Sequence, residues 1–140
     1  MAKVLIADDS DIVRAQVKSG LAAFGHEIVE AADGQAALDY LYRRAEFRDP
    51  DQFPRPDLIL LDLRLPKVDG LEVLKTIKSD PGLSRTPVVI LTTSAAEADM
   101  VKAYDNHANS YLVKPVDFAQ FVKLMDTLGY YWLAWNEYPY

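Results

Sequence analysis

Five short apolar runs alternate along the chain with longer segments in which apolar residues recur every three to four positions. The runs are continuous and rich in Val, Ile and Leu, which is typical of strands in a sheet that helices cover on both faces. They occupy residues 4–7, 28–29, 58–61, 88–91 and 111–113. The pattern predicts five strands of a parallel sheet.

The segments between the runs have helical periodicity. We expect helices at about 11–24, 33–47 and 69–79, a fourth that begins near Ser94 and a fifth that begins near Asp117. Gly25 is placed to end the first helix, and Ser94 with Glu97 forms a capping-box pattern at the start of the fourth. Residues 46–56 hold three prolines and are expected to form a long loop.

Strand and helix alternate five times, which predicts right-handed crossovers and an α/β, doubly wound five-stranded parallel sheet. The expected strand order is 2-1-3-4-5, which places the ends of the first and third strands on either side of the switch point. The length suits one domain, which we assign to residues 1–127. Residues 128–140 are expected to continue the fifth helix as an aromatic C-terminal extension.

The composition narrows the class of protein. The chain has 140 residues, a formal net charge of −6 and no cysteine. The charge argues against non-specific binding to nucleic acid, and the lack of cysteine excludes disulfides and thiolate metal sites. No apolar run reaches the roughly 18 residues of a membrane span, and the N-terminus lacks the pattern of a signal peptide. We therefore expect a cytoplasmic protein without a nucleic-acid or membrane partner.

Four of the five runs lead directly into residues that could carry chemistry. They are Asp8 with Asp9, Asp62, Thr92 with Thr93, and Lys114. Because the carboxyl ends of parallel strands meet at one edge, we expect three carboxylates, two hydroxyls and an ammonium to gather there. Three close carboxylates repel one another unless a cation lies between them. Oxygen ligands without Cys or a positioned His favour Mg²⁺.

This set of residues indicates phosphoryl transfer. Mg²⁺ beside a carboxylate suits transfer of a phosphoryl group to Asp62, because an aspartyl phosphate is an established covalent form. Lys114 and Thr92 suit the charge on the phosphoryl oxygens. Taken alone, Asp8 and Asp9 could form a solvated turn in which one of them caps the first helix. Thr92 alone could be a residue at the end of a strand, and Lys114 with Pro115 could form a simple turn.

Some neighbouring polar residues have a plainer interpretation. Ser10 and Asp11 fit caps of the first helix better than metal ligands. His26 and His107 have no partner pattern, and both are expected to be structural or exposed to solvent.

The chain resembles the receiver domain of two-component response regulators, which has a flavodoxin-like fold. The resemblance covers the whole chain. It rests on Asp8-Asp9, on Asp62 within the segment DLRLPKVDG, on Thr92 and on Lys114-Pro115.

The resemblance implies a role for each matching residue. Asp62 would accept a phosphoryl group from a histidine kinase. Asp9, Asp62 and the backbone carbonyl of Arg64 would bind Mg²⁺, and Asp8 would hold a metal-bound water. The Arg64 side chain, where the family often has a smaller or neutral residue, could shield the phosphate or point to water.

The same resemblance implies a phosphoryl-binding set and a switch. Thr92 and Lys114 would bind the phosphoryl oxygens, with Thr93 beside them. Tyr111, three residues before Lys114, lies where the family has an aromatic residue that rotates inward as Thr92 moves.

The chain is also similar to single-domain regulators that partner phytochrome-type light-sensing kinases. This similarity rests on the proline-bearing loop and on the segments 91–94 (LTTS), 114–117 (KPVD), 131–133 (YWL) and 138–139 (YP). It implies a bacterial or cyanobacterial phytochrome as the sensor histidine kinase. The alternative is a phosphorelay intermediate, or a phosphate sink, for a kinase of another type.

Other functions fit the residues less well. An aspartyl phosphohydrolase of the haloacid dehalogenase type needs a second Asp two positions after the nucleophile, where this chain has Arg64. A flavin mononucleotide module would need a Ser/Thr-rich loop where the chain has Asp8-Asp9. A degenerate receiver would not keep the full set. We therefore expect a signalling protein and not an enzyme.

The C-terminal segment is unusually aromatic. Six of the final eleven residues are Tyr or Trp. This stripe could fold back onto the core, but exposed aromatic surface on this scale usually marks an interface. We expect a homodimer in which the contacting residues include Tyr131, Trp132, Trp135 and Tyr138.

Overall fold

A computed structural model of the chain describes residues 3–22, 25–92, 110–113 and 119. The helices expected near Ser94 and Asp117 and the aromatic extension lie outside these residues, apart from the single helical position Ala119. Among the described residues, every helix is too short or too polar to cross a membrane.

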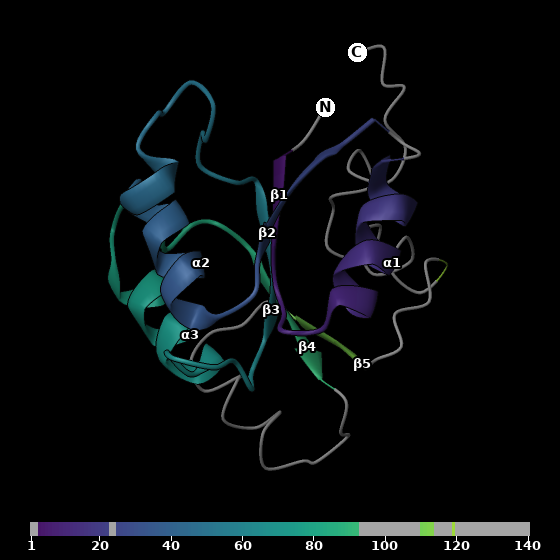
Figure 1. Cartoon of the computed structure of the whole chain (residues 1–140). Helices are drawn as coiled ribbons and strands as arrows, with labels where there is room; N and C mark the ends of the chain where they lie inside the picture. The colour runs from purple at the N-terminus through teal and green to yellow at the C-terminus, as the bar shows by residue number, and fades with distance from the viewer. Residues whose placement is uncertain (1–2, 23–24, 93–109, 114–118, 120–140) are drawn as a thin grey trace.

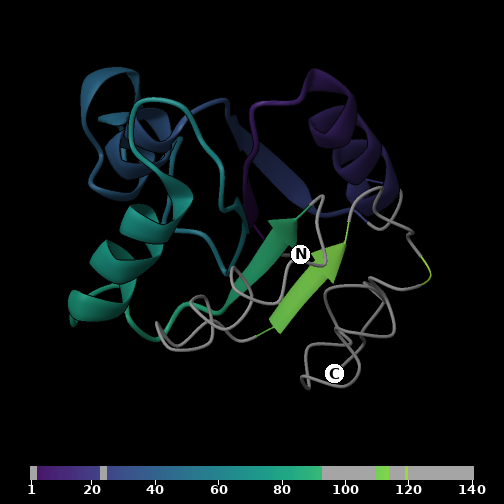
Figure 2. The same ribbon diagram turned by 90° about the horizontal axis from the view of Figure 1, so that it is seen from below.

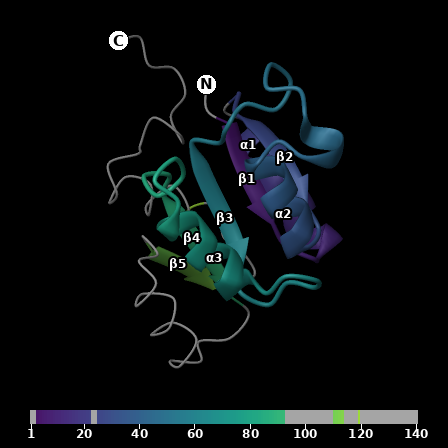
Figure 3. The same cartoon turned by 90° about the vertical axis from the view of Figure 1, so that its left-hand side faces the viewer.

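Five parallel strands form one sheet. They are β1 (Lys3–Ala7), β2 (Glu27–Ala31), β3 (Leu58–Asp62), β4 (Val88–Thr92) and β5 (Ser110–Val113). Their order is β2-β1-β3-β4-β5, as Figure 3 shows, so the predicted doubly wound order is confirmed. The order reverses between β1 and β3, where open α/β sheets place their sites.

Helices cover both faces of the sheet. Helix α1 (Asp11–Ala22) lies on one face, and α2 (Gly34–Leu41) and α3 (Gly70–Ser79) lie together on the other (Figures 1 and 2). Alternate residues of a strand point to opposite faces, so both sets of apolar side chains in β1, β3 and β4 are buried. This explains why these strands have continuous apolar runs.

Apolar side chains pack on both faces of the sheet. A buried cluster lies between the sheet and the pair α2 and α3, and includes Leu5, Ile59, Leu61, Leu74 and Ile77. Helix α1 covers the other face with a narrow stripe of Val13, Val17 and Leu21. The spacing of four residues keeps this stripe on one side of the helix.

Gly25 ends α1 as predicted. Its φ of 81° is in the left-handed region that glycine adopts readily. The Gly25 N–H donates to the Ala22 carbonyl at 2.9 Å, and the His26 N–H donates to the Leu21 carbonyl at 3.4 Å. These are the two hydrogen bonds of a Schellman motif.

The second helix is shorter than predicted. The sequence predicted a helix over residues 33–47, whereas α2 ends at Leu41 and a separate 3₁₀ turn, η1, spans Ala45–Phe47. Arg43 and Ala45 have φ values of 54° and 53°, which no continuous right-handed helix allows.

An aromatic cluster explains this break in the helix. The ring of Tyr40 lies 5.4 Å from that of Phe47 and 6.1 Å from that of Phe53. The Tyr40 hydroxyl also donates to the Pro54 carbonyl at 2.5 Å. After the turn that follows Leu41, Phe47 is buried in the core.

Candidate metal centre

Three carboxylates meet where β1 and β3 end. Asp62 is the last residue of β3, and Asp8 directly follows β1, whose Ala7 pairs with Leu61. One carboxylate oxygen each from Asp8, Asp9 and Asp62 lies within 4.8 Å of the other two. The structure therefore brings together the acidic cluster that the sequence predicted.

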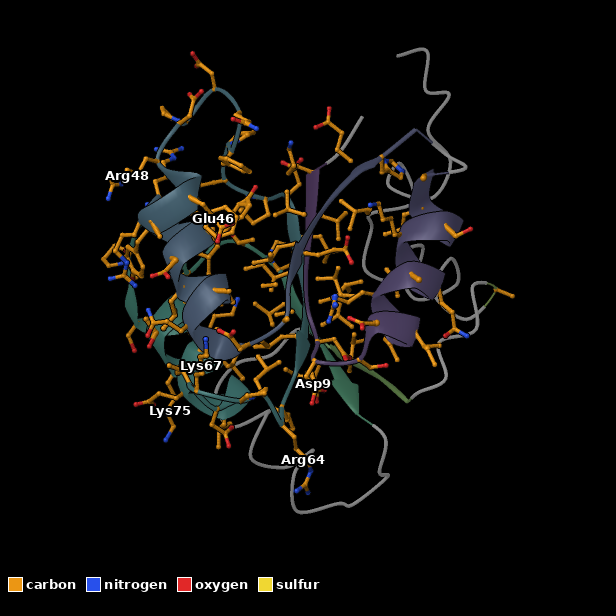
Figure 4. All side chains as sticks on the ribbon, viewed as in Figure 1. Asp9, Glu46, Arg48, Arg64, Lys67 and Lys75 are labelled. Carbon is orange, nitrogen blue, oxygen red and sulfur yellow. The ribbon has the colours of Figure 1, made fainter. Side chains whose placement is uncertain are left out.

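The three carboxylates differ in exposure. Asp8 is fully buried and Asp62 is 6% exposed, whereas Asp9 is exposed. Figure 4 shows Asp9 at the lower edge of the sheet, near the start of α1. The cluster thus has a buried base and an open side from which a small ion or a phosphoryl donor can approach.

The loop between β1 and α1 has a defined shape. The Ser10 N–H donates to Asp8 Oδ1 at 2.8 Å. The Ser10 hydroxyl accepts from the Val13 N–H at 3.2 Å, so Ser10 caps α1 as predicted. Asp11 is the first residue of α1 and forms an ion pair with Arg14.

Hydrogen bonds also fix the loop that follows Asp62. The Arg64 N–H donates to Asp62 Oδ1 at 2.9 Å, and the Gly70 N–H donates to the Leu63 carbonyl at 3.0 Å. A Cβ atom at position 70 would lie 1.9 Å from the Asp62 carbonyl oxygen, so only glycine fits there. The Arg64 side chain is exposed and extends outward from this edge (Figure 4).

The donor set fits a hard divalent cation. Carboxylate oxygens are the ligands that Mg²⁺ takes from proteins, and one or two of them suffice because the ion keeps several waters. Two buried carboxylates beside a third also create mutual repulsion that a cation relieves. Asp8, Asp9 and Asp62 are the residues that could hold such an ion.

The remaining predicted site residues lie on or after β4 and β5. Asp62 pairs with Leu91, and Thr92 pairs with Val113, so the strand register places Thr92 on the strand next to Asp62. Tyr111 is in β5 and pairs with Ile90. Lys114 and Thr93 lie outside the described residues, as do the side chains of Thr92 and Tyr111.

His26 lies far from this cluster, at the opposite end of the sheet, just before β2. It is 4% exposed, which favours the structural interpretation over the solvent-exposed one. Burial lowers the pKa of its imidazole, and the positive N-terminus lowers it further, whereas Asp57 raises it. His107 lies outside the described residues.

Sequence reasoning did not find Arg14, whose guanidinium donates to the Asp8 carbonyl at 2.6 Å. The sequence did contain a basic residue one turn into the helix, and a side chain at that position can reach back to the loop before the helix. Nothing in the spacing alone singled out that residue from Lys18, which is also on α1.

A family comparison agrees with this geometry. The family model of the response regulator receiver domain matches residues 4–126. The chain therefore belongs to the receiver-domain family of response regulators.

Two relatives cover almost the whole chain. The probable methanogenesis regulatory protein FilR2 of Methanothrix harundinacea is 42% identical over 97% of this chain and 86% of its own. The response regulator Rcp1 of Synechocystis sp. is 42% identical over 94% of this chain and 86% of its own. The chain thus has the same sequence identity to both of these regulators.

Solved structures of similar proteins have the same fold. The phosphorylated cyanobacterial phytochrome response regulator RcpA is 40% identical, with a TM-score of 0.80 over 95% of this chain and 94% of its own. The Mn²⁺-bound form of Rcp1 is 39% identical, with a TM-score of 0.78 over 95% of both chains. Close relatives with this fold have therefore been seen with a phosphoryl group or with a divalent metal ion.

Proposed function

We propose that this chain is a response regulator that accepts a phosphoryl group on Asp62 from a sensor histidine kinase and signals through contacts with other proteins. The observation that carries the proposal is the cluster of Asp8, Asp9 and Asp62 within 4.8 Å at the carboxyl edge of the sheet. Membership of the receiver family supports it.

The transfer is a displacement at phosphorus. A carboxylate oxygen of Asp62 forms a bond to phosphorus while the bond from phosphorus to the donor nitrogen of the kinase histidine breaks. The electron pair of that bond leaves with the imidazole. Asp62 becomes an acyl phosphate, and the phosphoryl group adds negative charge to the edge that already carries Asp8 and Asp9.

Mg²⁺ is the proposed cofactor: Asp9, Asp62 and the carbonyl of Arg64 would hold it, and Asp8 would hold a water bound to it. When bound, the ion offsets the negative charge of the carboxylates and the incoming phosphoryl group. The protein itself holds the carboxylates in position. Asp8 is buried and hydrogen-bonded to Ser10, and Asp62 is oriented by the Arg64 N–H, so neither carboxylate has to be ordered during transfer.

Residues on or after β4 and β5 are proposed to bind the phosphoryl group and to report its presence. Thr92, Thr93 and Lys114 would bind the phosphoryl oxygens, and Thr92 with Tyr111 would form the switch that reports phosphorylation. The register that places Thr92 on the strand beside Asp62 supports the first role. The position of Tyr111 in β5, at the edge of the sheet, supports the second.

The kinase partner is proposed to be a phytochrome-type light sensor. Support comes from the similarity to RcpA, a cyanobacterial phytochrome response regulator. The equal identity to FilR2, whose name refers to methanogenesis, supports the alternative of a kinase of another type, for which the chain would be a phosphorelay intermediate or a phosphate sink. Transfer rates from a purified phytochrome kinase and from an unrelated histidine kinase would distinguish the two.

The proposed division of the chain is a receiver domain over residues 1–127 and an aromatic extension over residues 128–140. The family match to residues 4–126 supports the first boundary. The extension would serve dimerisation or docking, and not the chemical step.

Phosphorylation by acetyl phosphate tests the central assignment. With Mg²⁺, we expect the wild-type chain to gain about 80 Da, the mass of one phosphoryl group, in a form labile to acid and base. Asp62→Asn should abolish the gain. Asp57→Asn is a matched control, because Asp57 also flanks β3 but lies at its opposite end. Undiminished labelling of Asp62→Asn would overturn the assignment.

A further inference from the structure

Arg14 lies in the first turn of α1 and bonds to the loop that carries Asp8 and Asp9. Its Nη1 donates to the backbone carbonyl of Asp8 at 2.6 Å. This carbonyl belongs to the peptide group that joins Asp8 to Asp9, and the peptide group is planar. A bond that orients the carbonyl therefore also sets the direction in which Asp9 leaves the strand.

The guanidinium is held in place by two further partners. Arg14 Nε donates to Glu30 Oε1 at 3.2 Å, and Nη2 donates to Asp11 Oδ1. The Arg14 side chain is only 12% exposed, although it is charged. A guanidinium presents five N–H donors in a rigid plane, so one arginine can serve three acceptors in different directions. Arg14 thus links α1, β2 and the acidic loop.

The backbone of Asp8 has hydrogen bonds on both sides. Its N–H donates to the Ala31 carbonyl of β2 at 3.0 Å. The pairing of β1 with β2 ends at Ala7 and Ala31, so the Asp8 carbonyl is the first one beyond the paired strand. The Asp8 carbonyl therefore accepts a hydrogen bond from the Arg14 side chain, in place of the backbone N–H that a paired strand would offer.

We propose that Arg14 is a positioning residue for the site: it holds the peptide between Asp8 and Asp9 so that the carboxylate of Asp9 faces that of Asp62. The inference rests on the proposed function. Arg14 acts through the loop and not on the phosphoryl group. Its charge is already balanced by Glu30 and Asp11, so its contribution depends on the direction of its donors.

Magnesium titration of the full chain by calorimetry tests this role. We expect Arg14→Met to weaken Mg²⁺ binding by about tenfold, the usual effect of losing a group that orients a metal ligand. Arg14→Lys should recover little of this loss, because a lysine ammonium cannot keep all three directed bonds. The Mg²⁺ affinity of Glu30→Gln should lie between those of wild type and Arg14→Met. This change weakens the bond that holds the guanidinium to β2 but leaves the bond from Arg14 Nη1 to the Asp8 carbonyl.

Lys18→Ala is the matched control. Lys18 also lies on α1, and its Nζ atom pairs with Glu30 Oε2 at 3.4 Å. Unlike Arg14, it forms no hydrogen bond with Asp8 or Asp9 in the part of the chain that the structure describes. We expect wild-type Mg²⁺ affinity for this variant. Titrations are made at a temperature at which each variant is folded, and if Arg14→Met does not fold, Arg14→Lys and Glu30→Gln carry the test.

Amide NMR spectra add a readout that a general loss of stability would not move. In Arg14→Lys, the amide signals of Asp9 and Ser10 should shift, while those of α3 should stay in place. The inference is wrong if Arg14→Met binds Mg²⁺ as wild type does, or if Arg14→Lys restores full affinity. Phosphorylation of the wild-type chain on Asp62 would stand in either case, and its absence would instead contradict the proposed function.

Discussion

Gly70 lies directly against the backbone carbonyl of Asp62: a Cβ atom at position 70 would come within 1.9 Å of that oxygen and within 2.7 Å of the Cα of Leu63. Both neighbours are backbone atoms, which cannot turn aside as the end of a side chain can. The first residue of α3 therefore fixes how closely the helix approaches the end of β3, and the peptide after Asp62 is held between them.

We expect Gly70→Ala to destabilise the fold and to displace Asp62. The added methyl group must push α3 away from β3, at a cost of about 3 kcal/mol in the free energy of unfolding. Phosphorylation by acetyl phosphate should slow as well, since the acceptor carboxylate moves with its backbone. Urea unfolding and the initial rate of phosphorylation measure the two effects.

Gly82→Ala is the control for this change. A Cβ atom at position 82 would meet the Nη1 atom of Arg55 at 2.9 Å, and that flexible side chain can move. We expect a change of no more than about 0.5 kcal/mol and an unchanged rate. Equal stability losses for the two variants would contradict the role assigned to Gly70.

Asp9 and Lys114 are expected to affect metal binding in opposite ways. Asp9→Ala removes a proposed ligand, so Mg²⁺ affinity should fall by at least about tenfold. Lys114→Ala removes a positive charge and should leave Mg²⁺ affinity unchanged or slightly higher, while phosphorylation slows. Asp51→Ala, which removes an exposed carboxylate from the loop before β3, controls for the change in net charge. Wild-type Mg²⁺ affinity in Asp9→Ala would show that the proposed ligand set is wrong.

The sheet and the acidic edge were predictable because both depend on regularities over a few residues. Apolar runs predicted the strands, and the polar residues after four of these runs predicted which side chains meet at the carboxyl edge. The alternation of strand and helix then limited the possible strand orders. Asp8, Asp9 and Asp62 were found in this way.

The features that were missed depend on contacts between distant residues. Tyr40 and Phe47 are seven residues apart, which also fits a continuous helix. The chain turns between them, and both rings pack against Phe53, which lies farther along the chain. Arg14 reaches Asp8 and Glu30 from a third element. Neither the periodicity nor the spacing of a sequence contains such tertiary contacts.

Tyr40 makes stability depend on alkaline pH. Its hydroxyl is buried and bonded to the Pro54 carbonyl, and burial is the main cause that raises its pKa to about 12 from the usual 10.0. A group whose pKa is raised by folding stabilises the fold fully below its unfolded pKa and loses that contribution as pH rises through the folded value. The contribution of Tyr40 to the free energy of unfolding is therefore lost between about pH 10 and about pH 12.

We expect Tyr40→Phe to lower the free energy of unfolding by about 1 kcal/mol at neutral pH, since the Pro54 carbonyl loses its donor. The difference from wild type should shrink above pH 10, where the wild-type hydroxyl begins to ionise on unfolding. Urea midpoints measured from pH 7 upward test this. Phe47→Leu, which loosens the same cluster without touching a hydroxyl, should give an offset independent of pH. A constant offset for Tyr40→Phe would refute the assignment.

The aromatic extension is expected to make the protein a homodimer. Tyr131, Trp132, Trp135 and Tyr138 would supply an apolar surface that is larger than a monomer commonly exposes. Replacing Trp132 and Trp135 together by Ser should shift the sedimentation coefficient of the full chain to that of a monomer at tens of micromolar protein, and a chain truncated after Thr127 should do the same. Phosphorylation of Asp62 by acetyl phosphate should proceed unchanged in both, because the extension takes no part in the transfer.

The experiment also separates the three roles open to the extension. A wild-type dimer that both changes dissociate establishes the interface, and a further change in sedimentation with acetyl phosphate would couple that interface to the site. If the extension instead completes the core, both changes should lower the urea midpoint of a wild-type monomer. A wild-type monomer whose stability neither change affects would rule out the dimer and leave the extension as a docking segment for another protein.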